Sequence, residues 1–126
     1  MSTRKSGKLL LTERAIADLI GIEAYSVEQW GKRVASRYVD SLESALQLIR
    51  ADPDILLAFD NLPKTLRYYR AEKHLIVCDV AEKTTVVLTI IHASMDIANR
   101  LSELLPQLRG EIELLHQRVR SHRRKK

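Results

Sequence analysis

The chain has 126 residues, 45% of them hydrophobic and 29% charged, a composition that fits one small globular domain and excludes a disordered chain. No run approaches the roughly 18 apolar residues that cross a bilayer, and Leu9 to Leu11 is too short for the apolar core of a signal peptide. Cys78 is the only cysteine, which excludes an internal disulfide and favours a cytoplasmic protein with no membrane partner.

The net charge of +5 is concentrated at the C-terminus. From His116 onward the chain has six basic residues and no acidic ones, which leaves 15 basic and 16 acidic residues for the rest. An exposed cationic block attracts phosphate groups without reading a base sequence. The alternative is a solvated tail with no role in function. The candidate nucleic-acid contacts are Arg118, Arg120, Arg123, Arg124, Lys125 and Lys126.

The first predicted elements are a short edge strand over residues 8–11 and a helix capped by the hydroxyl of Thr12. The apolar face of this helix contains Ile16, Leu19 and Ile20. We expect the helix to end near Tyr25, because Ser26-Val27-Glu28-Gln29 fits a capping box that would begin a second helix.

The second helix has an apolar stripe with steps of three and four residues, which keeps one face towards a core for about six turns. The stripe is Val34, Tyr38, Leu42, Ala45 and Ile49. Pro53 is expected to end this helix, since the residue before a proline is pushed out of helical geometry.

A loop over residues 52–63 comes next, and its apolar residues are expected to fold against the core: Ile55, Leu56, Leu57 and Phe59. Three runs rich in β-branched and aromatic residues follow at 66–70, 74–80 and 85–91. Because their connectors are so short, these runs must form an antiparallel meander. The sequence therefore predicts an α+β fold, in which a short N-terminal strand and a helical hairpin accompany a three- to four-stranded antiparallel sheet.

After Asp96 the pattern is helical again, with apolar steps of four and three residues that form a heptad seam. The seam is Leu101, Leu105, Leu108, Ile112, Leu115 and Val119. An interior proline costs about 3 kcal/mol, so a kink or two short helices are expected near Pro106. The seam is expected to pack on the chain's own sheet or on a second copy. We divide the chain into a domain over 1–98 and a helical extension with a basic tail over 99–126.

The sequence predicts no metal and no cofactor. His74, His92, His116 and His122 lack the i, i+4 spacing, with acids between them, of a helical zinc site. Glycine-rich phosphate loops and nucleophile elbows do not occur. We interpret Cys78, which lies mid-strand without a basic neighbour, as a packed core residue rather than a nucleophile.

Two regions of the sequence carry a family resemblance. The three strand-like runs are closed by His92-Ala93-Ser94-Met95-Asp96, and together they are similar to the last three strands and the closing His-x-x-Met-Asp of the ParE branch of the ParE/RelE toxin superfamily. Residues 11–15 and 25–31, with Trp30-Gly31, followed by Ala35 and Tyr38, resemble its helical hairpin. The resemblance covers residues 8–98. It departs from the family at Ser94, where many relatives carry arginine, and at Cys78, where an aromatic residue is usual.

The resemblance implies the toxin of a type II toxin–antitoxin system, of the plasmid-stabilisation kind, that acts by binding rather than by catalysis. Its implied partners are a cognate ParD-like antitoxin and the A subunit of DNA gyrase, with possible nonspecific DNA contact through the basic tail. The partner-binding candidates are Ile22, Val27, Trp30, Arg67, Arg70, His74, His92, Met95 and Asp96.

Two alternatives stay open. In the RelE branch, basic strand residues hold messenger RNA in the ribosome and an arginine near the end of the last strand stabilises cleavage. The basic cluster here is Lys64, Arg67, Arg70, Lys73 and His74, but the last strand ends in His92-Ala93-Ser94. Loss of such a cation costs about a hundredfold or more in rate, which disfavours a ribosomal nuclease. The other alternative is an interaction module without toxicity that works through the C-terminal helix and tail.

Overall fold

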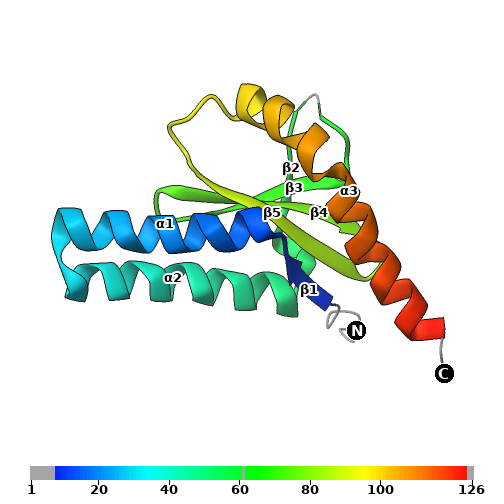
Figure 1. The fold of residues 1–126 in the computed structure, drawn as a ribbon, viewed down its shortest axis with the longest axis horizontal. Coiled ribbons are helices and arrows are strands. Elements are labelled where there is room, and N and C mark those ends of the chain that lie inside the picture. The colour runs from blue at the N-terminus through cyan, green and yellow to red at the C-terminus, as the bar shows by residue number, and fades with distance from the viewer. Residues whose placement is uncertain (1–7, 61, 125–126) are drawn as a thin grey trace.

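The computed structural model describes residues 8–60 and 62–124 (Figure 1). In chain order the elements are β1 (Lys8–Leu11), α1 (Glu13–Trp30), α2 (Lys32–Ala51), the 3-10 turn η2 (Pro53–Ile55), β2 (Leu57–Ala58), β3 (Leu66–Ala71), β4 (His74–Ala81), β5 (Thr84–His92) and α3 (Ile97–Arg124). The strands form one sheet in the order β1-β5-β4-β3-β2. β3, β4 and β5 are the predicted antiparallel meander, and β1 is an edge strand parallel to β5. The α+β prediction is confirmed, and the two-residue β2 adds a fifth strand.

Helices cover both faces of the sheet, so the described residues form an apolar core on each side of it (Figure 1). The hairpin of α1 and α2 packs on one face, where Leu42, Ile49 and Ile76 are fully buried. α3 packs on the other face, where Leu101 and Leu104 meet strand residues such as Leu88. The C-terminal extension therefore docks on the sheet of its own chain, which is one of the two arrangements expected from the sequence. Within the described ranges, no helix has the length and apolar character needed to cross a membrane.

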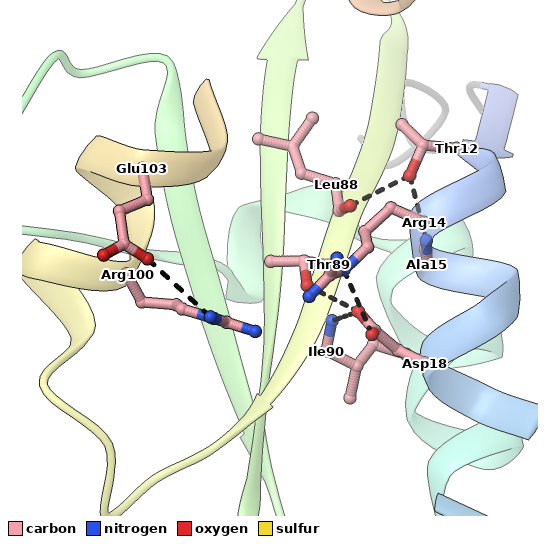
Figure 2. Close-up of polar contacts among 9 residues, drawn as sticks. All are labelled: Thr12, Arg14, Ala15, Asp18, Leu88, Thr89, Ile90, Arg100 and Glu103. Atoms are coloured by element: carbon pink, nitrogen blue, oxygen red, sulfur yellow. Dashed lines mark hydrogen bonds and ion pairs between the residues drawn. The ribbon is translucent and has the colours of Figure 1, made fainter. Parts of the chain in front are cut away.

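Thr12 caps α1 as predicted and also joins it to the sheet. Its Oγ1 accepts the N–H of Ala15 at 3.0 Å and donates to the carbonyl of Leu88 at 2.9 Å (Figure 2). Because the residue is completely buried, both contacts form away from water. They fix where α1 begins against β5.

Asp18 of α1 forms hydrogen bonds with the edge of β5 beyond the last residue of β1. Its Oδ2 accepts the N–H of Ile90 at 2.9 Å and the hydroxyl of Thr89 (Figure 2). Its Oδ1 lies 3.3 Å from Nε of Arg14, an ion pair whose geometry is too poor for a hydrogen bond. A helix side chain thus replaces the missing neighbouring strand as the partner of the β5 backbone.

The rotation of α1 differs from the prediction. Ile16 and Ile20 are 48% and 63% exposed, so placing them on the buried face was wrong. The stripe that faces the core is Ala15, Leu19, Ile22 and Ser26. The physical reason is that the polar contacts of Thr12 and Asp18 with β5 set the rotation of the helix, which turns its more hydrophobic isoleucines outwards.

The break between the two hairpin helices lies at Gly31, and the prediction that α1 ends near Tyr25 was wrong. α1 continues through Ser26, which is buried mid-helix and begins no capping box. Gly31 has φ +88°, a left-handed conformation that glycine adopts without Cβ strain, and its N–H donates to the carbonyl of Val27 at 2.9 Å. This single residue ends α1 and precedes α2.

α2 follows the predicted stripe except at its start. Leu42, Ala45 and Ile49 are buried and the helix ends at Ala51, ahead of Pro53. Val34 is 42% exposed, so its predicted burial was wrong, and Ala35, 1% exposed, is the buried residue of that turn.

The loop after α2 buries Leu56 and packs Ile55 and Phe59 partly against the two cores. Leu57 is 57% exposed, so its predicted burial was wrong. The physical reason is its position on β2, the outermost strand, where only one neighbouring strand pairs with it.

α3 is one continuous helix with Pro106 inside it, so two short helices do not form. The carbonyl of Ser102, which loses its helical N–H partner at the proline, belongs to an exposed residue and can bond to water, which lowers the cost. Leu101, Leu104 and Leu108 are buried on the sheet. The side chain of Val119 lies outside the described residues.

Candidate partner-binding groove

A groove of about 720 Å³ lies between the far part of the helical hairpin and the adjoining ends of β4 and β5. The hairpin projects past the sheet, which leaves this side of both helices uncovered (Figure 1). The groove is lined by Ile22, Tyr25, Ser26, Trp30, Val34, Tyr38, Glu72, Lys73, His74 and His92. One wall is therefore mainly apolar and the other mainly polar.

The apolar wall exposes three large side chains to solvent: Tyr25 at 58%, Trp30 at 53% and Val34 at 42%. Tyr25 and Trp30 stand edge to face, with ring centroids 5.9 Å apart and planes at 85°. Exposed apolar clusters of this kind mark interaction surfaces, and tryptophan and tyrosine are frequent anchors in them. Because the two rings brace each other, a partner would meet a partly preorganised surface.

At the polar wall, Tyr38 joins α2 to the turn between β3 and β4. Its Oη accepts the backbone N–H of Lys73 at 3.0 Å and lies 2.7 Å from Nδ1 of His74. The two rings also stand edge to face at 5.6 Å. Burial raises the pKa of Tyr38, so its phenol stays protonated.

His92 lies beside His74, with ring centroids 5.2 Å apart. Nδ1 of His92 accepts the backbone N–H of Ser94 at 3.1 Å and lies 2.8 Å from the hydroxyl of the same residue. Burial lowers the pKa of His74, and the neighbouring His92 lowers it further, against a smaller opposing effect of Asp18. The wall is therefore built around a neutral His74.

A β-bulge brings the two histidines together. From the turn up to Cys78, which pairs with Val87, the β4–β5 register is regular, but Val77 pairs with Thr89. The extra residue on β5 places His74 opposite His92. Without it, His74 would face Ile91, and the side chain of His92 would point to the other side of the sheet.

Four predicted partner-binding residues line the groove: Ile22, Trp30, His74 and His92. Val27 is half-buried on α1 and is not among the lining residues. Ile22 is also half-buried and packs against the hairpin core, so it contributes to the fold as well as to the groove.

The predicted basic cluster is not one surface. Arg67 and Arg70 are three residues apart on β3, so their side chains leave opposite faces of the sheet. Nε of Arg67 donates to the carbonyl of Lys64 at 3.1 Å, and Nε of Arg70 donates to that of Glu72 at 3.0 Å. Both guanidinium groups are held by local backbone, and neither lines the groove.

The last two partner-binding candidates lie at the start of α3. Met95 is 43% exposed, and Asp96 accepts the N–H of Asn99 at 3.3 Å as a helix cap. Of the nucleic-acid candidates, Arg118 is exposed on α3. Arg120, Arg123 and Arg124 belong to the helix, but their side chains lie outside the described residues, as do Lys125 and Lys126 entirely.

Sequence reasoning missed Tyr25 and Tyr38 as groove residues. Tyr38 was predicted only as part of the apolar stripe of α2. Its hydroxyl could have indicated a polar contact, because a part-buried phenol needs a hydrogen-bond partner. Tyr25 was masked by the wrong end of α1. If α1 is continued to Trp30, helical geometry places Tyr25 and Trp30 on the part of the hairpin that projects past the sheet.

Comparison with known proteins agrees with this fold. The family model of the ParE toxin of the type II toxin–antitoxin system, parDE, matches residues 9–97. Toxin ParE of Escherichia coli is 33% identical over 97 residues, which are 76% of this chain and 94% of that protein. Toxin ParE1 of Caulobacter vibrioides is 28% identical over 86 residues, which are 68% of this chain and 88% of that protein. Most of α3 lies beyond the matched residues.

Two solved structures have the same fold. A chain from the chromosomal ParDE system of P. aeruginosa matches with a TM-score of 0.62 and 19% identity, over 71% of this chain and 98% of that chain. A chain from the toxin–antitoxin complex RelBE2 of Mycobacterium tuberculosis matches with a TM-score of 0.53 and 14% identity, over 75% of this chain and 100% of that chain. On the family match and the E. coli relative, the protein belongs to the ParE toxin family of type II toxin–antitoxin systems.

Proposed function

We propose that this ParE-family toxin inhibits DNA gyrase by binding to it, and that a cognate antitoxin neutralises it by filling the groove beside the helical hairpin. The observation that carries the proposal is the exposed aromatic wall formed by Tyr25 and Trp30. Solved structures with the same fold as this toxin come from a ParDE system and from a RelBE2 toxin–antitoxin complex, and this supports a protein partner. A helix that lays its apolar face into such a groove is a common recognition mode.

The polar wall favours binding over catalysis. A general base needs a ring nitrogen free to take a proton from the substrate. In His74 and His92, Nδ1 already faces a hydroxyl or a backbone N–H. Because the pKa of His74 is lowered, its imidazole is mostly neutral at neutral pH and is a poor general acid. The end of β5, at His92, carries no arginine to stabilise a developing phosphorane.

A supercoiling assay with purified gyrase tests the proposal. The toxin is expected to inhibit supercoiling, and the antitoxin encoded in the same operon is expected to restore it. Messages in induced cells are expected to stay intact by primer extension. Cleavage at ribosomal A-site codons, abolished by Arg67→Ala or Arg70→Ala, would instead assign a RelE-like ribosome-dependent nuclease. Normal growth and normal supercoiling after induction would assign a non-toxic interaction module.

A further inference from the structure

The hydrogen bonds of the polar wall determine which nitrogen of each histidine carries the ring proton. A neutral imidazole has one donor and one acceptor nitrogen. The backbone N–H of Ser94 can only donate, so Nδ1 of His92 is the acceptor of their 3.1 Å contact. The proton of His92 is therefore on Nε2, which remains able to donate to a bound molecule.

Tyr38 orients His74 in the same way. Its Oη already accepts the N–H of Lys73, and among the contacts of the described residues the acceptor left for the phenol proton is Nδ1 of His74, 2.7 Å away, so we assign the proton to that contact. His74 thus also carries its proton on Nε2. The lowered pKa of His74 agrees with a neutral ring. Two neighbouring imidazoles, directly paired across β4 and β5, therefore each have an Nε2–H donor, and both residues line the groove.

With these tautomers, the two rings can bind a hydrogen-bond acceptor but not a metal cation. A metal ion needs an unprotonated ring nitrogen, and the unprotonated nitrogens already accept hydrogen bonds. Among the described residues, no group of three or more His, Cys, Asp or Glu is arranged to hold a metal ion. Lys73 brings a positive charge to the same wall, and a carboxylate is the strongest acceptor that a protein partner provides.

The apolar wall of the groove indicates whether the partner is a peptide or a nucleic acid. Ile22 and Val34 are aliphatic and fit apolar side chains, which a helix presents at three- and four-residue spacing. Phosphate backbones are bound by clusters of cations, whereas here Lys73 is accompanied by Glu72. The groove therefore fits an amphipathic peptide segment better than a nucleic acid.

We propose that the groove recognises one carboxylate of the antitoxin through the Nε2–H donors of His74 and His92, while apolar side chains of the same segment pack on Tyr25, Trp30 and Val34. This inference rests on the proposed function, in which the antitoxin occupies the groove. It adds the chemistry that distinguishes a matching segment from any other apolar helix, since a segment without the carboxylate would leave two donors desolvated and unpaired.

Paired substitutions test the proposal with the full chain and the antitoxin of the same operon. His92→Leu keeps an apolar volume and removes the donor, whereas His92→Gln keeps an amide N–H near the position of Nε2. His92→Leu is expected to weaken antitoxin binding at least about tenfold, and His92→Gln less than about threefold. The same pair of substitutions at His74 is expected to rank in the same order. Urea unfolding confirms that each variant is folded.

Antitoxin variants locate the acceptor. Each Asp or Glu of the antitoxin is changed to Asn or Gln, and one of these changes is expected to weaken binding about tenfold to wild-type toxin but not further to the His92→Leu variant. Long-range 1H–15N spectra are expected to show Nε2–H tautomers for both rings.

Three outcomes would contradict the proposal, and they differ in their consequence for the proposed function. If the antitoxin binds but no carboxylate couples to His92, the donor pair is not a recognition site, while the proposed function stands. If the antitoxin does not bind at all, the proposed function fails with it. If a single-stranded dT oligonucleotide binds and His92→Leu weakens only that binding, the groove is a nucleic-acid site.

Discussion

His116 of α3 lies against Asp79 of β4, with Nε2 and Oδ1 3.3 Å apart and side chains only 10% and 18% exposed. A second polar contact lies one and a half turns earlier, where Oε2 of Glu111 accepts the N–H of Glu13 at 3.0 Å. The extension beyond the family match is thus joined to both β4 and the first turn of α1. α3 is held by specific contacts as well as by its leucines.

Breaking the His116–Asp79 contact is expected to destabilise the protein. His116→Ala and Asp79→Ala should each lower the free energy of unfolding by about 1 to 3 kcal/mol, because the remaining group stays largely buried without its partner. The double variant should cost less than the sum, by about 0.5 kcal/mol or more. Urea unfolding of all four proteins measures the coupling. Gln117→Ala, an exposed neighbour, is the control, and strictly additive losses would contradict a direct contact.

Leu101 is expected to be among the residues of α3 that matter most for stability. It is 1% exposed in the second core, so Leu101→Ala should cost about 2 to 5 kcal/mol through lost apolar burial and the cavity left behind. Leu114, on the same helix, is 55% exposed, and Leu114→Ala should change stability by less than about 0.5 kcal/mol. Thermal and urea unfolding compare the two. Equal losses would mean that α3 does not dock as described.

Much of the fold was predictable because local signals decided it. The short connectors at Glu72 and Glu82 leave an antiparallel meander as the only geometry, and Thr12 has the side chain that a helix cap requires. Predictions failed where two local signals competed or where a distant contact decided. Ser26 fits a capping box, yet the helix breaks at Gly31, where the backbone has positive φ. The rotation of α1 depends on Asp18 reaching β5, a contact 72 residues apart in sequence.

The candidate site was only half predictable for a similar reason. His74 and His92 stand out in the sequence, but counting pairs back from the turn places His74 opposite Ile91. The bulge between Val77 and Cys78 shifts that register, and nothing in the strand sequence marks it. The tautomers require in addition the positions of Tyr38 and Ser94, which only the tertiary structure supplies.

Trp30 is expected to be a main energetic contact for the antitoxin. Trp30→Ala should weaken antitoxin binding by about 2 kcal/mol or more, roughly thirtyfold, because tryptophan anchors in apolar grooves carry much of the binding energy. It should change the stability of the free toxin little, since the side chain is 53% exposed. Leu57→Ala, at a similarly exposed apolar residue on β2, is the matched control and should bind normally. Calorimetry with the antitoxin of the same operon measures both. Equal affinities of the two variants would place the antitoxin elsewhere.

Cys78 is expected to be unreactive in the folded protein. Burial raises the pKa of its thiol to about 12, and the neighbouring Asp79 adds to the shift, so almost no thiolate exists at pH 8. The side chain is also completely buried. Reaction with a disulfide reagent at pH 8 should be slow in buffer and stoichiometric in 6 M guanidinium, with free glutathione as the reference thiol. Rapid labelling of the native protein would show that β4 is accessible.

The stability of the protein is expected to decrease below neutral pH in part through His74. Burial, followed by the electrostatic interaction with His92, lowers the pKa of His74 in the folded state, whereas in the unfolded chain it titrates near its ordinary value of about 6.5. As the pH falls below that value, the unfolded state therefore binds a proton before the folded state does. The free energy of unfolding decreases through this window and stops decreasing, for this group, below the folded pKa.

His74→Gln removes this titration and keeps a polar side chain of similar length. The loss of stability between pH 7.5 and pH 5, measured by urea unfolding, should be smaller in the variant than in the wild-type protein. Tyr38→Phe is a useful companion, because it removes the hydroxyl that lies 2.7 Å from Nδ1 of His74 but leaves the imidazole to titrate, so its loss of stability with falling pH should persist. The ring signals of His74 in an NMR titration report its folded pKa directly. Parallel stability curves for wild type and His74→Gln would mean that the imidazole is as free to protonate in the fold as in the unfolded chain, and the neutral ring on which the groove's donor pattern depends would have to be abandoned.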